Sequence, residues 1–67
     1  EQLLALNQAL ERLGQIEPRL LQVAEMRAVL GLEVPEVALA LGLSEPTVKR
    51  DWQRAKAFLT TTLGPAA

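Results

Sequence analysis

Four polar side chains near the C-terminal end of the chain have the types and the spacing to bind an anionic, hydrogen-bonding surface. Lys49, Arg50, Gln53 and Arg54 lie at intervals that place them on one face of a helix. The planar arginine fork can bond two acceptors of a guanine or a phosphate, glutamine suits adenine, and lysine is a flexible point charge. These side chains therefore suit contact with nucleic acid, and the alternative is an ordinary solvated helix face, which charged runs usually form.

The residue types that are missing exclude other chemistry. The 67 residues contain no cysteine and no histidine, which removes disulfides, thiolate or imidazole metal ligands and the commonest general base. Paired carboxylates, a nucleophile with its base, or a phosphate loop cannot be assembled from the remaining residues. We therefore predict a protein that is not an enzyme, needs no cofactor and holds no metal.

Charge is divided unevenly along the chain, although the net charge is −1. Residues 1–45 hold seven acidic groups and three basic ones, whereas residues 46–67 hold four basic groups and one acidic group. A nucleic-acid-binding domain usually carries a basic excess overall. A local patch nevertheless acts on its own at physiological salt, where the Debye length is about 8 Å.

The elements that must position these side chains are helices. Apolar residues recur at helical spacing in four segments, which predict helices at about 2–13, 18–30, 34–41 and 45–62. Glycines 14, 31 and 42 are expected to end the first three. The expected inward stripe of the first helix is Leu3, Leu6, Leu10 and Leu13, and that of the second is Leu20, Val23 and Leu30. The prediction is one all-α domain over residues 1–63 with a disordered tail at 64–67.

Segments 34–41 and 45–62 form a helix-turn-helix pattern, in which two helices meet through a turn of three or four residues that often contains glycine. The turn is Leu41-Gly42-Leu43-Ser44, and Ser44 is a good N-cap for the helix that follows. The second helix of such a pair enters the major groove. Its buried stripe is predicted to be Val48, Trp52, Ala55 and Leu59. The residues turned outward are then Pro46, Lys49, Arg50, Gln53 and Arg54.

Arg27 is predicted to be a structural cation. It lies on the otherwise apolar face of segment 18–30, where an unpaired charge would be expensive. Glu36, near the start of the next helix, is its candidate partner.

The run MRAVLGLEVPEVALALGLSEPTVKRDWQRAKAFL resembles region four of bacterial sigma-70 family sigma factors, especially the extracytoplasmic-function (ECF) group. The resemblance covers nearly the whole chain, and TVKRDW followed by RAKAFL is its most specific part. It implies recognition of the promoter −35 element by the last helix, within a factor that directs RNA polymerase to initiate transcription. It also implies docking on the β-subunit flap of RNA polymerase and capture by an anti-sigma factor.

Carried over by position, the resemblance places Ser44, Thr47, Lys49, Arg50 and Arg54 against DNA, and it supports the pairing of Arg27 with Glu36. Together with the outward residues and the first turn of the last helix, the candidate DNA-binding set is Ser44, Glu45, Pro46, Thr47, Lys49, Arg50, Gln53 and Arg54.

Two other functions fit parts of the pattern. The output domain of a response regulator or repressor would use the same motif, normally as a dimer on a two-fold site, and the residues upstream of Glu1 would distinguish it. A helical protein-interaction module would suit the acidic total charge, but it does not account for the basic residues on the outward face of segment 45–62. No apolar run reaches the 18 or so residues of a membrane span, so we expect no membrane partner. The sequence shows no basic-then-apolar leader and is interpreted as a fragment of a longer protein, so we expect the location of that protein, by default cytoplasmic.

Overall fold

The computed structural model describes residues 2–64, and in this part of the chain every regular element is a helix. The elements are α1 (Gln2–Ile16), α2 (Pro18–Ala24), a π-helical turn η1 (Glu25–Val29), α3 (Val34–Leu41) and α4 (Glu45–Leu63). Since η1 continues α2 directly, the two correspond to the helix predicted at 18–30. The all-α prediction is confirmed, and the prediction for 34–41 matches α3. Most of the predicted tail, residues 65–67, lies outside the described residues.

The predicted end of the first helix at Gly14 is wrong, because α1 continues to Ile16. Gly14 serves packing instead: a Cβ at this position would lie 2.5 Å from Cδ2 of Leu21, so the missing side chain lets α2 approach α1 closely. The helix ends before Pro18, whose ring disfavours helical geometry in the preceding residue. Glu17 is accordingly extended, with φ −150° and ψ 98°.

Two predicted core positions are also wrong. Leu3 is 72% exposed and Leu30 is 66% exposed. On α1 the buried residues are Ala9 and Leu13, so inward packing begins only in the second half of that helix. Leu30 is displaced by η1, whose wider turn has the Leu30 N–H donating to the Glu25 carbonyl at 3.0 Å. A π turn carries an extra residue, so positions beyond it rotate off the α-helical stripe.

The core consists of two adjoining clusters that Trp52 joins. The buried members of one are Leu13, Leu20, Ala24 and Ala55, and those of the other are Val23, Val37, Ala38 and Val48. Trp52 is half-buried and packs against both clusters, which confirms that it belongs to the interior. Phe58 adds to the first cluster.

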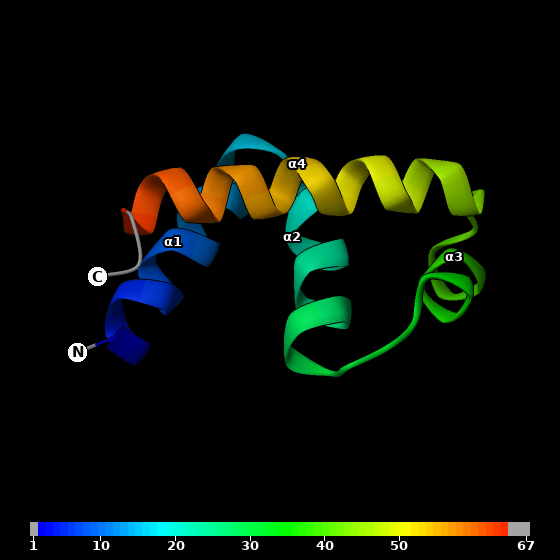
Figure 1. Ribbon diagram of the computed structural model, residues 1–67, viewed down its shortest axis with the longest axis horizontal. Helices are drawn as coiled ribbons and strands as arrows, with labels where there is room; N and C mark the ends of the chain where they lie inside the picture. Colours follow the sequence, from blue (N-terminus) through cyan, green and yellow to red (C-terminus); the bar gives the residue numbers. More distant parts are fainter. Residues whose placement is uncertain (1, 65–67) are drawn as a thin grey trace.

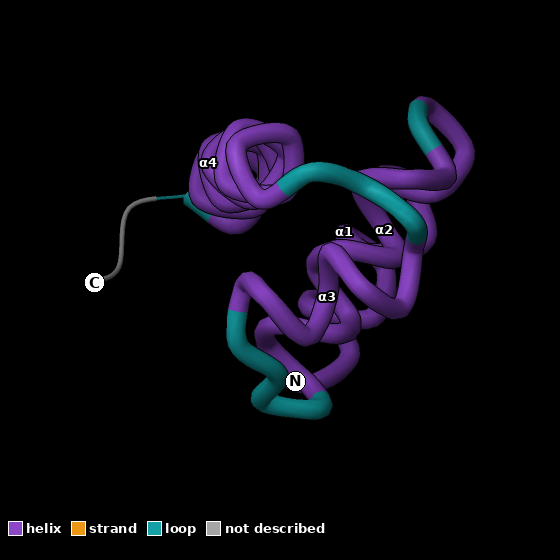
Figure 2. The backbone as a smooth tube through the Cα atoms, turned by 90° about the vertical axis from the view of Figure 1, so that its right-hand side faces the viewer, coloured by secondary structure: helices purple, strands orange, loops and turns teal. Residues whose placement is uncertain are grey.

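The long helix α4 lies along one side of the other elements and contacts α1, α2 and α3. Figure 1 shows α3 beneath its N-terminal end, α2 beneath its middle and α1 beneath its C-terminal part. Seen end-on in Figure 2, α4 has α1, α2 and α3 gathered on one side of it. The opposite side of α4 is left uncovered along its length.

Trp52→Ala should therefore destabilise the whole domain, because it removes the side chain shared by both clusters. Truncation of a core aromatic costs about 3 kcal/mol or more, a large part of the stability of so small a domain. Thermal melts followed by circular dichroism measure the effect. Leu39→Ala is the matched control, because Leu39 is 87% exposed and its truncation should change the melting temperature little. A Trp52→Ala protein that melts with the wild type would contradict this packing.

Candidate nucleic-acid interface

The turn between α3 and α4 is built as the sequence predicts. Gly42 ends α3 with φ 69°, in the left-handed region that glycine adopts without strain. The Leu43 N–H then donates to the Ala38 carbonyl at 2.9 Å, and Leu43 packs against the second cluster. These contacts close the corner and set the direction in which α4 leaves α3.

Ser44 is the N-cap of α4, as expected. Its Oγ accepts a hydrogen bond from the Thr47 N–H at 3.3 Å and donates one to the Thr47 Oγ1 at 2.8 Å. Glu45 follows in the first turn, where a carboxylate stabilises the positive end of the helix dipole. Thr47 is thus occupied by the cap, while Glu45 and Pro46 are exposed.

The outward face of α4 carries Lys49, Arg50 and Gln53, all exposed. Within residues 2–64 neither of the two cations has a carboxylate within ion-pair distance. The fully buried residues of α4, on its inward face, are Val48, Asp51 and Ala55. The uncovered side of α4 is therefore polar and carries free positive charge.

Arg54 is exposed, as predicted, but it already forms an ion pair with Glu17. Its Nη2 donates to Oε2 of Glu17 at 3.0 Å, which ties the middle of α4 to the junction of α1 and α2. The Arg54 side chain is 53% exposed and the Glu17 side chain is 37% exposed. Arg54 thus lies at one flank of the face, with an acidic neighbour.

Asp51, the one acidic residue of segment 46–67, was not predicted to have a structural role. Asp51 is 1% exposed. Nε of Arg19 lies 2.7 Å from its Oδ2, and Nη2 of Arg19 donates to its Oδ1 at 3.2 Å. The signal was present in the sequence, since Asp51 lies three residues after Val48 and four before Ala55, on the inward face of the helix.

The predicted pair of Arg27 and Glu36 is wrong. Nη1 of Arg27 donates to the Leu32 carbonyl at 2.7 Å and lies 3.9 Å from Oε1 of Glu33. Glu36 is occupied by its own helix start, where its Oε1 accepts a hydrogen bond from the Glu33 N–H at 2.8 Å. Capping α3 thus takes the carboxylate that Arg27 was expected to use.

Arg27 also packs over the indole ring of Trp52. Its guanidinium lies 5.4 Å from the centre of the indole ring, and Nζ of Lys56 lies at the same distance. Two cations at this range from one ring make favourable cation–π contacts. The ring is therefore held between α2–η1 and its own helix, and is not free to stack on a base.

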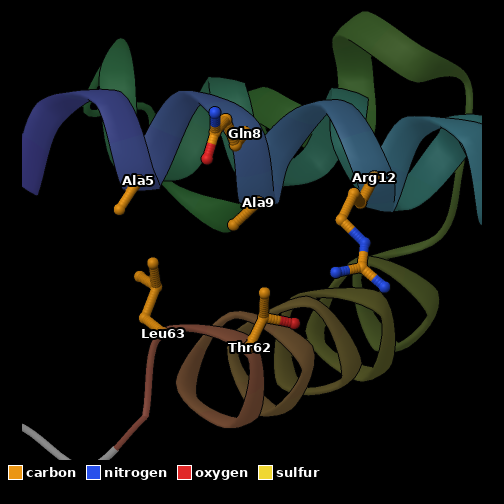
Figure 3. Close-up of a pocket in the computed structure, with 6 residues that line it drawn as sticks. All are labelled: Ala5, Gln8, Ala9, Arg12, Thr62 and Leu63. Carbon is orange, nitrogen blue, oxygen red and sulfur yellow. The ribbon is translucent and has the colours of Figure 1, made fainter.

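A hollow of about 260 Å³ lies between α1 and the C-terminal end of α4. In Figure 3, Ala9 and Arg12 of α1 point toward Thr62 and Leu63 of α4. Arg12 is the charged residue among those that line it. Among the described residues there is no group of acidic side chains that could hold a metal ion, and none of the helices there is both long and apolar enough to cross a membrane.

The short helix α3, the turn at Gly42 and the long helix α4 define a helix-turn-helix domain. The family model described as ECF sigma factor matches residues 1–64, and the chain belongs to this family. The family acts in transcription initiation, with RNA polymerase and promoter DNA as partners. This membership separates the chain from the response regulators and repressors that share the motif. Comparisons with curated proteins and with solved structures found no match.

The pair of Arg19 and Asp51 leads to an asymmetric prediction. Arg19→Ala leaves the buried Asp51 carboxylate without its cation and should cost about 3–5 kcal/mol. Asp51→Asn leaves no buried charge, because the Arg19 side chain is 46% exposed and can be hydrated, so it should cost only about 1–2 kcal/mol. Urea denaturation measures both values. Arg12→Ala, the removal of an exposed arginine, is the control, and equal losses for Arg19→Ala and Asp51→Asn would refute the asymmetry.

Proposed function

We propose that this domain binds the promoter −35 element with α4 in the major groove of DNA. The observation that carries the proposal is the side of α4 that the other helices leave uncovered (Figure 2), together with the exposure of Lys49, Arg50 and Gln53. An α-helix with its side chains is about 10–12 Å across, and the major groove of B-DNA is about 12 Å wide. The helix can therefore enter with these side chains leading.

The two cations take different roles in this proposal. Arg50 lies near the middle of the exposed face and close to the N-terminal end of α4, so it reads a base, most favourably guanine through its O6 and N7. Lys49 lies toward the flank that carries Lys56 and binds the phosphate backbone as a point charge. Gln53, one turn beyond Lys49, suits adenine. The helix start at Ser44 lies beside this face, where the positive end of the helix dipole favours a backbone phosphate, although the Ser44 hydroxyl itself is engaged with Thr47.

The partner assignments beyond promoter DNA and RNA polymerase belong to the same proposal. The resemblance supports docking on the β-subunit flap and capture by an anti-sigma factor. Val29 and Leu30 are 65% and 66% exposed, and the end of η1 lies on the side of α2 away from α4 in Figure 1. A protein that covers this apolar pair leaves α4 open to DNA. The role is binding and not catalysis.

The domain alone should bind DNA weakly, with a shallow dependence on salt. Residues 46–67 supply four cations, so few phosphates are neutralised, and log affinity against log salt should have a slope on the order of −2 to −4 at about −0.9 per phosphate. Titration of a labelled duplex containing a −35 element, at several salt concentrations, gives the slope. An absence of binding at low salt, for this chain and for a longer sigma factor that contains it, would refute the proposal.

Arg50→Ala and Lys49→Ala should separate base reading from backbone binding. Arg50→Ala should lose about 1–3 kcal/mol on the preferred promoter duplex and much less on a scrambled duplex, whereas Lys49→Ala should weaken binding to both about equally. Competition between the two duplexes for each variant measures the difference. The reverse pattern would mean that α4 is rotated in the groove relative to this assignment.

A further inference from the structure

The ion pair between Arg54 and Glu17 joins the flank of the proposed DNA-binding face to a fixed part of the fold. Glu17 is the one residue between α1 and α2. Its N–H donates to the Leu13 carbonyl at 2.8 Å, and its carbonyl accepts from the Leu20 N–H at 3.0 Å. The backbone that carries this carboxylate is therefore held by hydrogen bonds to both helices, and is not part of a long loop.

The pair contributes little to stability. Both side chains are substantially exposed, and exposed ion pairs are worth little because water and salt screen them. Its position is more informative. Arg54 follows Arg50 by four residues on α4, so it lies one turn along the same side of the helix. A phosphate that reaches this flank meets a guanidinium that a carboxylate already holds.

We propose that Glu17 is a built-in competitor of DNA for Arg54 and so limits the affinity of the domain. A DNA phosphate offers the guanidinium the same paired acceptor geometry as a carboxylate, and the exposed pair can exchange one for the other. Glu17 also adds a negative charge beside the approaching backbone. Both effects weaken binding, and both act through phosphate, so they do not depend on the base sequence. This inference rests on the proposed DNA binding.

The test compares Glu17→Gln with Glu11→Gln on one labelled duplex of mixed sequence. Both variants remove one negative charge, and Glu11 is an exposed residue of α1 without an ion pair among the described residues. Glu17→Gln should bind about two- to fivefold more tightly than Glu11→Gln at low salt. The difference should shrink as salt is raised, because both the competition and the repulsion are screened.

The same substitution in an Arg54→Gln background completes the cycle. There, Glu17→Gln should gain clearly less than it does in the wild-type background, because the group that Glu17 competes for is absent and only the charge repulsion remains. Melting temperatures within a few degrees of one another, measured for all variants, establish that binding and not folding is compared.

The outcomes separate the two proposals. If the wild type binds and Glu17→Gln gains no more than Glu11→Gln, or if its gain is undiminished without Arg54, the competition is refuted and DNA binding stands. If Glu17→Gln binds more weakly than the wild type, Glu17 orients Arg54 for DNA, and the competition is refuted as well. If no folded variant binds the duplex at low salt, the proposed function fails and the inference fails with it.

Discussion

The rotation of α4 about its own axis is the constraint on which the proposed interface depends. Successive residues of an α-helix are offset by about 100°. A shift of one residue would therefore carry Asp51 to the direction that Arg50 now holds, and would place a carboxylate near the centre of the exposed face. The burial of Val48, Asp51 and Ala55 selects the rotation in which that face is polar and basic.

Two kinds of contact fix α4 in this rotation: apolar packing, which is not directional, and an ion pair, which is. The apolar contacts of Trp52 with both clusters supply much of the free energy of packing, but apolar surfaces tolerate small slides and repacking. The contact between Arg19 and Asp51 is directional, because the guanidinium is planar and both carboxylate oxygens lie near it. The pair thus fixes the rotation of α4 against α2, because turning α4 about its axis would carry Asp51 away from Arg19.

Periodicity and turn chemistry were sufficient to predict most of the fold from the sequence. The positive φ of Gly42, the Ser44 cap and the bounds of α3 follow from local rules that do not require the partner helices. The errors arose where tertiary contacts compete with local signals. Gly14 resembles a helix end but makes room for Leu21, and the π turn at η1, which rotates Leu30 outward, has no clear signature in a single sequence.

The charged residues show the same limit within the candidate site. Helical periodicity placed Lys49, Arg50 and Gln53 on the exposed face, because that requires only the register of one helix. It could not identify the partners of Arg54 or Arg19, since Glu17 and Asp51 lie 37 and 32 residues away in the chain. Glu36 was assigned to Arg27 on position, whereas the backbone of its own helix start competes for the same carboxylate.

These placements explain how a domain of net charge −1 can present a basic face and still be suited to weak binding. Of the four cations in residues 46–67, Arg54 is paired with Glu17 and Lys56 lies against Trp52, which leaves Lys49 and Arg50 for the first contact with DNA in the proposed binding mode. A family that works with RNA polymerase has no need of a tightly binding isolated domain. Once a protein contact holds the domain beside the promoter, DNA binding becomes effectively intramolecular, and a modest affinity is multiplied by the effective concentration.

When the domain is held beside the promoter in this way, a strong backbone attraction would chiefly increase binding to wrong sequences, because phosphate contacts carry no sequence information. In the proposed binding mode, partial neutralisation of the basic residues, with Arg50 left free to read a base, therefore favours discrimination over affinity.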